Sequence, residues 1–420
     1  MARTTGTYRE TVAGGETIRA FIHRPLPPDD PQLLISGELA ELHAEAVAAL
    51  GQLEVAGAMV PSAGWFLYGF TRKEALVSSQ IEGTQATLMD VVEYEATEQS
   101  DRPADVEEVC NYVDALSFAR HELAREGGLP LCVRLLCQAH RRLMQGVRGA
   151  QKQPGEIRTS QNWIGGTRPG NARYVPPPPD VVREALADLE QWIQSEDPLP
   201  PLVRAGLAHV QFETIHPFLD GNGRIGRLLI ALLVERWGLL SSPLLYLSLA
   251  FKRRQQEYYR RLSAVRSEGD WEGWTEFFLE CVQESATDGV DSARRLHALV
   301  GEDRRRIVGH KAATIPTVKL FDLLPEHPVV TLSSVCEMVD ISPPTASKVI
   351  NTLCEAHVLV ETTGRARGRK YAYKTYLNVL AENTEPSETP SPARLSDGLQ
   401  RTNERFGDAL RRLGSKGDNE

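Results

Sequence analysis

The chain has 420 residues, of which 41% are hydrophobic, and its formal net charge is −9. This length predicts roughly two or three domains with packed cores, and the acidic balance argues against indiscriminate nucleic-acid binding by the whole chain. The cysteines form no CxxC pair, so neither a zinc site nor a disulfide framework is indicated. No apolar run of about 18 residues occurs, and residues 1–10 lack a signal-peptide pattern. Both features predict a soluble, cytoplasmic protein without a membrane partner.

Residues 1–36 are predicted to form an arm packed on the helices after it, because four prolines between positions 25 and 31 exclude a long helix. From Gly37 an apolar stripe at helical spacing predicts a helix, and Trp65 to Ile81 predicts another. The stripe consists of Leu39, Leu42, Val47, Leu50 and Leu53. We assign residues 37–128 to an N-terminal helical region.

The second of these helices ends in the sequence SSQIEG at residues 78–83. Ser78 and Glu82 are four residues apart and therefore share one helix face, and Gly83 is suited to end the helix. Taken alone this is a weak signal, because a solvated glutamate before a C-terminal glycine is common.

Residues 129–290 are predicted to form the core domain, which starts at the junction between two helical patterns over residues 105–145. Two short β-capable runs then flank a turn-rich centre, which predicts a hairpin that contains Ile164 and Gly165. An ordinary surface hairpin would give the same pattern. Helices over Val181 to Ser195 and Leu202 to Thr214 come next.

The most informative stretch is HPFLDGNGRIGR at residues 216–227. Pro217 biases His216 away from helical angles, so we expect the preceding helix to end there with the imidazole on an exposed turn. With an unperturbed pKa of about 6.5, an imidazole can serve as a general base at neutral pH. Asp220 supplies the hard oxygen ligand that Mg²⁺ prefers.

The second half of this stretch favours a phosphate site. Gly221 and Gly223 lack Cβ atoms, so their backbone N–H groups can approach an anion closely. The helix expected to begin near Arg224 adds the positive end of its dipole. Arg224 and Arg227 are three residues apart on the first turn, so both guanidinium groups can bind one polyphosphate. The pattern therefore indicates a phosphate site with a base beside it.

Two other interpretations explain part of this stretch. Residues 221–226 spell G-x-G-x-x-G, but the dinucleotide fingerprint needs a preceding strand and an acid about 20 residues later. No Asp or Glu occurs between Glu235 and Glu257. An ordinary capped helix would explain the carboxylate and the glycines, but it leaves the two arginines and the histidine without a purpose.

The same twelve residues resemble the H-P-F-x-D-G-N-G-R-x-x-R signature of the Fic family, and every specified position is met. The resemblance extends over roughly residues 60–285. It implies a mainly α fold, in which a Fic-type helical core carries a β-hairpin flap. It also implies transfer of AMP from ATP to a hydroxyl side chain (Ser, Thr or Tyr) of a target protein.

Carried across residue by residue, the resemblance assigns a role to each signature position. His216 would deprotonate the target hydroxyl, and Asp220 would hold Mg²⁺. Asn222 and the neighbouring glycine backbone would cradle the α- and β-phosphates. Arg224 would bind the β-phosphate, and Arg227 would bind the γ-phosphate.

The pattern of Ser78 and Glu82 before a glycine resembles the inhibitory motif of this family. It implies that Glu82 pairs with Arg227, so that this arginine cannot bind the γ-phosphate until the pair is displaced. In some relatives the matching glutamate is also thought to help remove AMP, and the sequence leaves both roles open. In the same family the hairpin holds the target segment by strand addition, with Ile164 as a candidate clamp.

A third region, residues 304–380, resembles a winged helix-turn-helix, a small α+β domain with three helices and two strands around a basic loop. Its candidate DNA contacts are Lys348 on the third helix and, in the basic loop, Arg365, Arg367, Arg369 and Lys370. Many winged helices bind proteins instead. Residues 381–420 are rich in Pro, Ser, Thr and Glu in their first part, and we expect them to be disordered.

The sequence therefore favours an ATP-dependent, Mg²⁺-requiring protein adenylyltransferase restrained by Glu82. Two alternatives stay open: a DNA-binding transcriptional regulator whose nucleotide site senses ATP, and an enzyme that mainly removes AMP from modified proteins. His216 separates the regulator from the enzymes, because a pure sensor needs no base. A homodimer is also left open.

Overall fold

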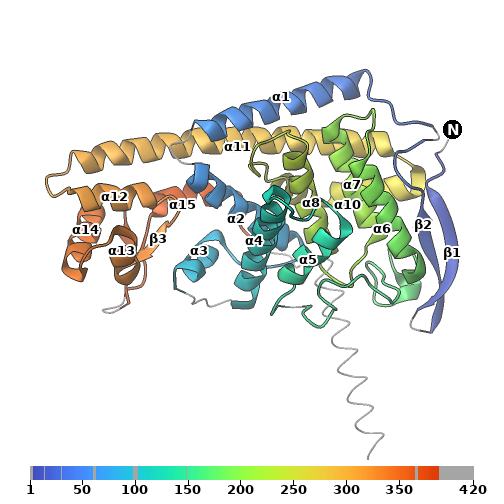
Figure 1. Cartoon of the computed structure of the whole chain (residues 1–420), viewed down its shortest axis with the longest axis horizontal. Coiled ribbons are helices and arrows are strands. Elements are labelled where there is room, and N and C mark those ends of the chain that lie inside the picture. The colour runs from blue at the N-terminus through green and yellow to red at the C-terminus, as the bar shows by residue number, and fades with distance from the viewer. Residues whose placement is uncertain are drawn as a thin grey trace, which may run out of the picture.

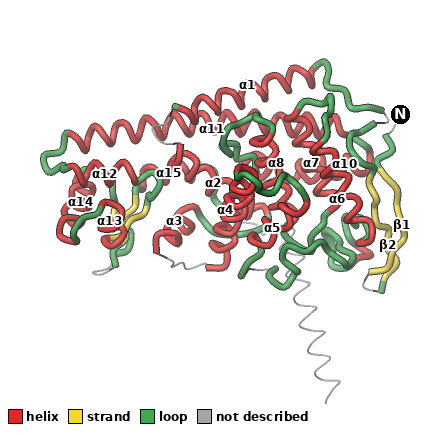
Figure 2. Tube along the Cα trace, in the orientation of Figure 1, coloured by secondary structure: helices red, strands yellow, loops and turns green. Residues whose placement is uncertain are grey.

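The computed structural model describes residues 3–13, 15–29, 31–59, 63–97, 103–147, 149–364 and 368–386. Over these residues the fold is mainly helical, as predicted, with two small antiparallel sheets at opposite ends of an elongated molecule (Figures 1 and 2). None of the described helices combines the length and apolar character needed to span a bilayer.

Two long helices lie side by side along one edge of the molecule (Figure 1). These are α1, Glu38–Ala58, and α11, Trp271–Val308. They approach closely where Gly289 faces Leu53, since a Cβ at Gly289 would lie 2.8 Å from a methyl carbon of that leucine. The predicted core and third region are separated at residues 290–304, but α11 runs through this interval without a break. One continuous helix therefore joins the two regions.

The remaining helices of the N-terminal helical region and the helices of the core pack beneath this pair (Figure 1). They are α2 (Ala63–Ile81), α3 (Leu88–Thr97), α4 (Pro103–Ala124), α5 (Val133–Leu143), α6 (Pro179–Gln194), α7 (Pro201–Ile215), α8 (Asn222–Arg236), α9 (Ser248–Arg253) and α10 (Gln255–Glu268). Every residue of α7 from Leu202 to Ile215 is buried, and α7 packs against α8. A fully enclosed α7 fixes the position of the next segment of the chain, which is the HPFLDGNGRIGR stretch.

The N-terminal arm contains a hairpin that the sequence analysis missed. Strands β1, Gly6–Ala13, and β2, Glu16–His23, pair antiparallel over their whole length. The prolines used to predict an irregular arm come only after β2. The N–H of Phe21 donates to the carbonyl of Val175 at 3.0 Å, so the hairpin also braces the segment that leads into α6.

The predicted hairpin in the core is present in a reduced form. A single β-bridge joins Ile164 to Tyr174, with the N–H of Ile164 donating to the carbonyl of Tyr174 at 2.8 Å. No regular strand forms on either side, and a short 3₁₀ turn, Pro169–Asn171, occupies the tip. We call residues 157–175 the flap.

The third region contains the predicted helices and two further elements. Its helices are α12 (Ile315–Leu323), α13 (Leu332–Val339), α14 (Pro343–Glu355) and α15 (Lys374–Ala381), and its strands are β3 (Val329–Thr331), β4 (Val360–Glu361) and β5 (Lys370–Ala372). The strand order is β3-β5-β4, all antiparallel. The sequence analysis missed β3 and α15. Of the tail predicted to be disordered, residues 387–420 lie outside the described residues.

Candidate active site

The signature loop connects the end of α7 to the start of α8. As predicted, α7 ends at Ile215, immediately before the His216-Pro217 pair. His216 adopts a left-handed conformation with φ 50° and ψ 61°, while its N–H still donates to the carbonyl of Phe212 at 2.9 Å. A left-handed backbone at a non-glycine residue costs free energy and persists only where surrounding contacts hold it.

His140 on α5 is one source of those contacts. Its Nδ1 accepts the N–H of Gly155 at 2.8 Å, so Nε2 carries the proton and donates to the carbonyl of Asp220 at 2.9 Å. The ring also stacks on Phe218 with 3.8 Å between centroids. Burial lowers the pKa of His140 to about 4, which keeps the ring neutral at pH 7. His140 therefore holds the signature loop and is not a second base.

Arg158, at the start of the flap, holds the loop from the other side. This side chain is only 1% exposed, and its Nε donates to the carbonyl of His216 at 2.8 Å. One terminal nitrogen donates to the carbonyl of Pro177 at 2.6 Å. The two bonds fix the flap relative to the histidine backbone. Sequence reasoning missed Arg158, because its partners are carbonyls distant in the chain and no periodic pattern marks it.

The imidazole of His216 is more enclosed than the sequence predicted. Its side chain is 16% exposed, so the expectation of an exposed turn is wrong. Burial, and then the positive charge of Arg158, lower the pKa of His216 to about 3. The ring is therefore neutral at physiological pH, which is the protonation state a general base needs.

Glu213, one turn before the loop, is a further buried acid that sequence reasoning missed. One carboxylate oxygen lies 4.0 Å from Nδ1 of His216. The other has no hydrogen-bond partner among the described residues and lies where a Cβ at Gly226 would fall, 2.5 Å away. Burial raises the pKa of Glu213 to about 7. The glycine at 226, inside α8, makes room for this carboxylate.

The raised pKa of Glu213 predicts a pH-dependent stability. From about pH 4.5 to pH 7 the unfolded chain loses this proton while the folded chain keeps it, so the free energy of unfolding falls as pH rises. The fall amounts to about 3 kcal/mol. In the Glu213→Gln variant the free energy of unfolding should fall less between these pH values. Urea unfolding at several pH values measures this, and equal slopes in the two proteins would refute the assignment.

The start of α8 presents backbone amides in the manner of an anion site. Gly221 precedes the helix with φ 74°, and a Cβ there would lie 2.9 Å from the sulfur of Met144. The resemblance implies that Asn222 cradles phosphates. In the structure its side-chain oxygen accepts the N–H of Phe218 and its amide donates to the Phe218 carbonyl, both at 2.8 Å. Asn222 thus shapes the loop through both side-chain polar atoms.

The guanidinium of Arg224 lies at this helix end, and some of its hydrogen-bond donors are unpaired within the described part of the chain. The residue is 4% exposed, and neither Nε nor Nη1 has a hydrogen-bond partner among the described residues. Its Nη2 contacts only the sulfur of Met144, at 3.5 Å, and lies 4.0 Å from Asp220. Buried polar groups without partners are costly, and a phosphate oxygen would satisfy these donors.

Arg227, by contrast, is bound by Ser78 at the end of α2 and by Glu82 just after it. Its Nε donates to Oγ of Ser78 at 2.9 Å, and its Nη2 donates to the carbonyl of Ser78 at 2.9 Å and to Glu82 at 2.8 Å. Burial disfavours the charged guanidinium, but the attraction and hydrogen bond of Glu82, together with Tyr258 and Glu213, raise the pKa of Arg227. The Glu82 carboxylate also occupies the space that a Cβ at Gly223 would need, so it reaches the first turn of α8.

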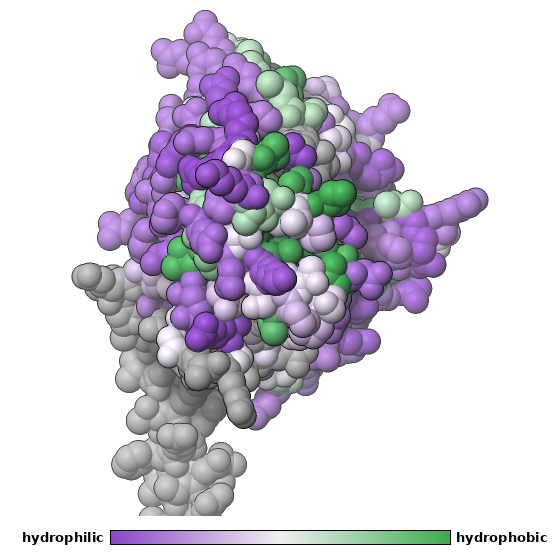
Figure 3. Space-filling model, turned by 90° about the vertical axis from the view of Figure 1, so that its left-hand side faces the viewer, coloured by the Kyte–Doolittle hydropathy of each residue, from purple (hydrophilic) through white to green (hydrophobic). Residues whose placement is uncertain are grey.

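Of the five candidate DNA contacts, Lys348, Arg369 and Lys370 are among the described residues, and Arg369 is exposed. Arg365 and Arg367 lie outside the described residues. Lys370 forms an ion pair with Glu93 of α3 at 3.1 Å, so it faces the N-terminal helical region. Lys348 is exposed on α14. Figure 3 shows this end of the molecule, where hydrophobic side chains are scattered among hydrophilic ones. The exposed large hydrophobic residues described in the third region are Val308, Ile315, Leu332 and Val360.

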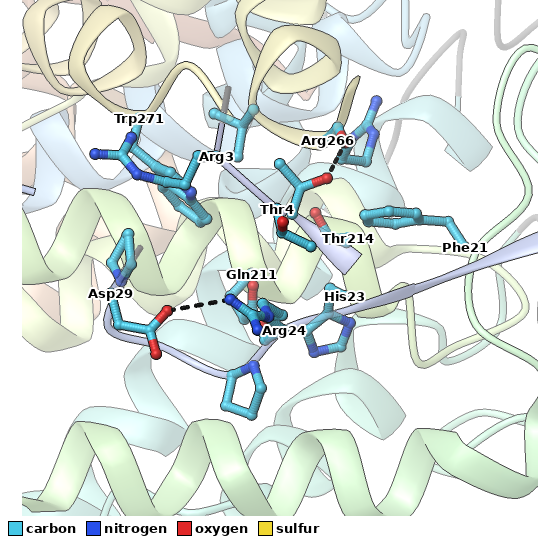
Figure 4. A pocket seen from close by; sticks show the side chains of 14 residues that line it. Arg3, Thr4, Phe21, His23, Arg24, Asp29, Gln211, Thr214, Arg266 and Trp271 are labelled. Atoms are coloured by element: carbon cyan, nitrogen blue, oxygen red, sulfur yellow. Dashed lines mark hydrogen bonds and ion pairs between the residues drawn. The ribbon is translucent and has the colours of Figure 1, made fainter. Parts of the chain in front are cut away.

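A pocket between the N-terminal hairpin segment and α7 is a second place to consider for an anion (Figure 4). Two of its three arginines are already ion-paired: Arg3 with Glu272 at 2.7 Å, and Arg24 with Asp29 at 3.5 Å. The third, Arg266, lies over the ring of Tyr174 at 4.1 Å. The pocket therefore suits a phosphate less well than the start of α8, where Arg224 has donors to offer.

The comparisons with known proteins agree with this geometry. Residues 130–234 match the Fic/DOC family, and residues 40–121 match the Fic/DOC family N-terminal model. The first segment contains the signature loop, and the second contains the part of α2 that binds Arg227. The two segments that form the candidate site are therefore the ones that match these family models.

Comparison with individual proteins also gives information about the fold. A Fic family protein from Desulfovibrio desulfuricans G20 is 23% identical with a TM-score of 0.52, over 81% of this chain and 97% of that one, which shows a Fic-type fold. Proteins named protein adenylyltransferase Fic from Drosophila erecta and Drosophila willistoni are each 30% identical over 159 residues, or 37% of this chain. The chain spans 29% of the length of these two relatives.

Proposed function

We propose that the chain is a protein adenylyltransferase, which transfers AMP from ATP to a serine, threonine or tyrosine hydroxyl of a target protein. Arg224 is the observation that carries this proposal most directly. Its buried donors lack partners among the described residues at the positive end of α8, and a neutral imidazole stands at the other end of the same short loop. A polyphosphate would satisfy the first feature, and a hydroxyl to be deprotonated would use the second.

The transfer can be derived from the positions of these groups. His216 takes the proton of the target hydroxyl as its oxygen attacks the α-phosphorus of ATP. The bond from the α-phosphorus to the bridging oxygen breaks, and pyrophosphate leaves. Arg224 and the amides at the start of α8 stabilise the charge on the phosphates. His140 and Arg158 hold the loop, so that base and phosphate meet in a fixed geometry.

Magnesium fits this site as a companion of the nucleotide. Among the described residues no cluster of three acids, histidines or cysteines could hold a metal alone. Asp220 offers one carboxylate, 38% exposed, beside Arg224. Mg²⁺ usually keeps several waters and binds through one or two carboxylates plus substrate phosphates. Asp220 would therefore hold Mg²⁺, which would neutralise phosphate charge when bound.

The target is expected to dock on the flap. The Ile164–Tyr174 bridge is the flap's single β-bridge, and Ile164 and Gly165 are only half-buried. An extended target segment could add to this backbone by main-chain pairing, which places little demand on its sequence.

Glu82 acts in this proposal as an internal brake. The γ-phosphate of ATP needs the guanidinium of Arg227, which Glu82 and Ser78 already occupy. The Glu82 side chain is 30% exposed while that of Arg227 is 2% exposed, so the carboxylate is the partner that can leave. The net stability of such a pair is modest once desolvation is counted, which makes the brake reversible.

ATP labelled at the α-phosphate tests the reaction class. Incubation with the chain, Mg²⁺ and candidate proteins should move label from α-labelled ATP onto protein. ATP labelled at the γ-phosphate should leave protein unlabelled. Transfer from the γ-label alone would indicate phosphorylation instead, and no transfer under any condition, including release of the brake, would refute the proposal.

A further inference from the structure

The end of α2 is held on a second side by residues that come after α15. Gln80 lies between Ser78 and Glu82 and is only 5% exposed. Its Nε2 donates to the carbonyl of Ala86 at 3.0 Å and to the carbonyl of Thr384 at 2.9 Å. The second bond joins residues 304 positions apart. The buried side-chain amide of Gln80, between the two residues that bind Arg227, therefore has a hydrogen-bond acceptor in the C-terminal part of the chain.

Lys252 on α9 completes this connection. Its Nζ donates to Oε1 of Gln80 at 2.7 Å and to the carbonyl of Glu385 at 2.5 Å. The ammonium thus bridges α2 to the backbone after α15. Gln80 uses both its oxygen and its nitrogen in these contacts, so its side chain has one defined position.

Residues 382–385, which we call the C-terminal strap, are themselves fixed at both ends. Glu382 forms an ion pair with Arg295 of α11 through two bonds of 2.5 Å. Thr384 is 3% exposed, and its N–H and hydroxyl both donate to the carbonyl of Ala381. The strap is therefore an ordered continuation of α15 that lies against the end of α2 at Gln80.

α15 also contacts α2 at Gly69, more than three helical turns before Glu82. A Cβ at Gly69 would lie 2.8 Å from a methyl carbon of Leu380, so only glycine allows this approach. Glycine inside a helix costs about 1 kcal/mol relative to alanine, and the close contact with α15 gives it a use. The third region thus contacts α2 through Leu380 as well as through the strap.

Motion at Gln80 would reach Glu82 through the backbone. The N–H of Glu82 donates to the carbonyl of Ser79 at 3.1 Å, and the N–H of Gly83 donates to the carbonyl of Gln80 at 2.9 Å. These bonds close the last turn around Gln80. A shift of this turn displaces the Glu82 carboxylate from Arg227.

We propose that the C-terminal strap sets the strength of the brake, so that the third region of the chain regulates the active site through Gln80 and Lys252. This inference rests on the proposed function, because it names the regulation of the same site. When the strap is in place, the end of α2 keeps Glu82 on Arg227. When the strap is released, the carboxylate leaves more often and ATP binds productively.

Substitution of Lys252 tests the inference in the full chain. With Glu82 intact, Lys252→Ala should raise label transfer from α-labelled ATP by about tenfold, which is the effect of weakening a coupling by about 1.4 kcal/mol. With Glu82→Gly already present, Lys252→Ala should add nothing, because the brake is gone. Arg304→Ala, which breaks an exposed ion pair with Asp322 in the third region, is the matched control and should leave the rate unchanged.

Amide hydrogen exchange gives a second readout that needs no activity. Lys252→Ala should speed exchange at residues 82–84, whose N–H groups close the end of α2. Unchanged exchange and an unchanged rate with Glu82 intact would overturn the inference, and so would an equal gain in the Glu82→Gly background. If Glu82→Gly transfers no label but exchange still speeds up, the strap contact stands and the proposed function fails.

Discussion

The Glu82→Gly variant is expected to transfer AMP onto protein about 10- to 100-fold faster than the native chain, in the range of typical coupling between two sites. The substitution removes the carboxylate 2.8 Å from Nη2 of Arg227 but leaves both Ser78 contacts. Arg227 therefore stays in place with a donor released for the γ-phosphate. Since Glu82 comes after the last helical residue, Ile81, glycine should cost little stability. Label transfer from α-labelled ATP measures the gain.

Glu82→Gln is the matched control for this result. Glutamine keeps the size and a hydrogen-bond acceptor but loses the charge, so its rate should fall between the native chain and Glu82→Gly. If glutamine matches the native rate while glycine is fast, the brake acts by bulk and not by neutralising Arg227. If Glu82→Gly is no faster than the native chain, Glu82 is not a brake.

His216→Ala, added to Glu82→Gly, is expected to lower the transfer rate by about 10²- to 10⁴-fold, the range that a positioned general base supplies. ATP binding should persist, because the start of α8, Arg224 and Arg227 are unchanged. Transfer assays and calorimetric titration with ATP separate the two effects.

The low pKa of His216 sets the expected pH dependence. Its pKa of about 3 lies below the ordinary value of 6.5, so the ring stays neutral as pH falls from 8 to 6. Protonation of this histidine should therefore not slow the Glu82→Gly enzyme across that range. The variant that carries both Glu82→Gly and His216→Ala tests the base assignment directly. If it transfers label as fast as Glu82→Gly alone, His216 is not the base.

Much of the helical fold could be predicted from periodic apolar residues. The helix expected over Trp65 to Ile81 is α2, Ala63–Ile81, and the one expected over Val181 to Ser195 is α6, Pro179–Gln194. Pro217 predicts the end of α7, since the residue before a proline avoids helical angles. These signals are local, so sequence alone contains them.

Features that depend on distant contacts could not be predicted in this way. His140, Arg158 and Glu213 bond or pack against segments far along the chain, and no spacing distinguishes them from other polar residues. The burial of His216 was missed for the same reason. Gln80 has the pattern of an ordinary helical residue, although the strap reaches it from the other end of the sequence.

For the flap, the sequence predicts more regular structure than the fold contains. Two β-capable runs predict paired strands, but the turn-rich centre permits only the Ile164–Tyr174 bridge. Other polar groups there are satisfied locally or by the signature loop, as when Asn162 donates to the carbonyl of Phe218 at 3.3 Å. The flap residues have the propensity to form strands, but within the described chain they lack the backbone partners that a continuous ladder of hydrogen bonds needs.

Calorimetric titration of the native chain and Glu82→Gly with ATP and ADP tests the central claim, competition for Arg227, most directly. ADP lacks the phosphate that Arg227 would bind. In the native chain ATP should bind no more tightly than ADP, because Glu82 holds the guanidinium. In Glu82→Gly, the affinity for ATP should be at least about ten times the affinity for ADP, as expected for a charge-assisted hydrogen bond to the γ-phosphate. The same ATP-to-ADP affinity ratio in both proteins would contradict the account.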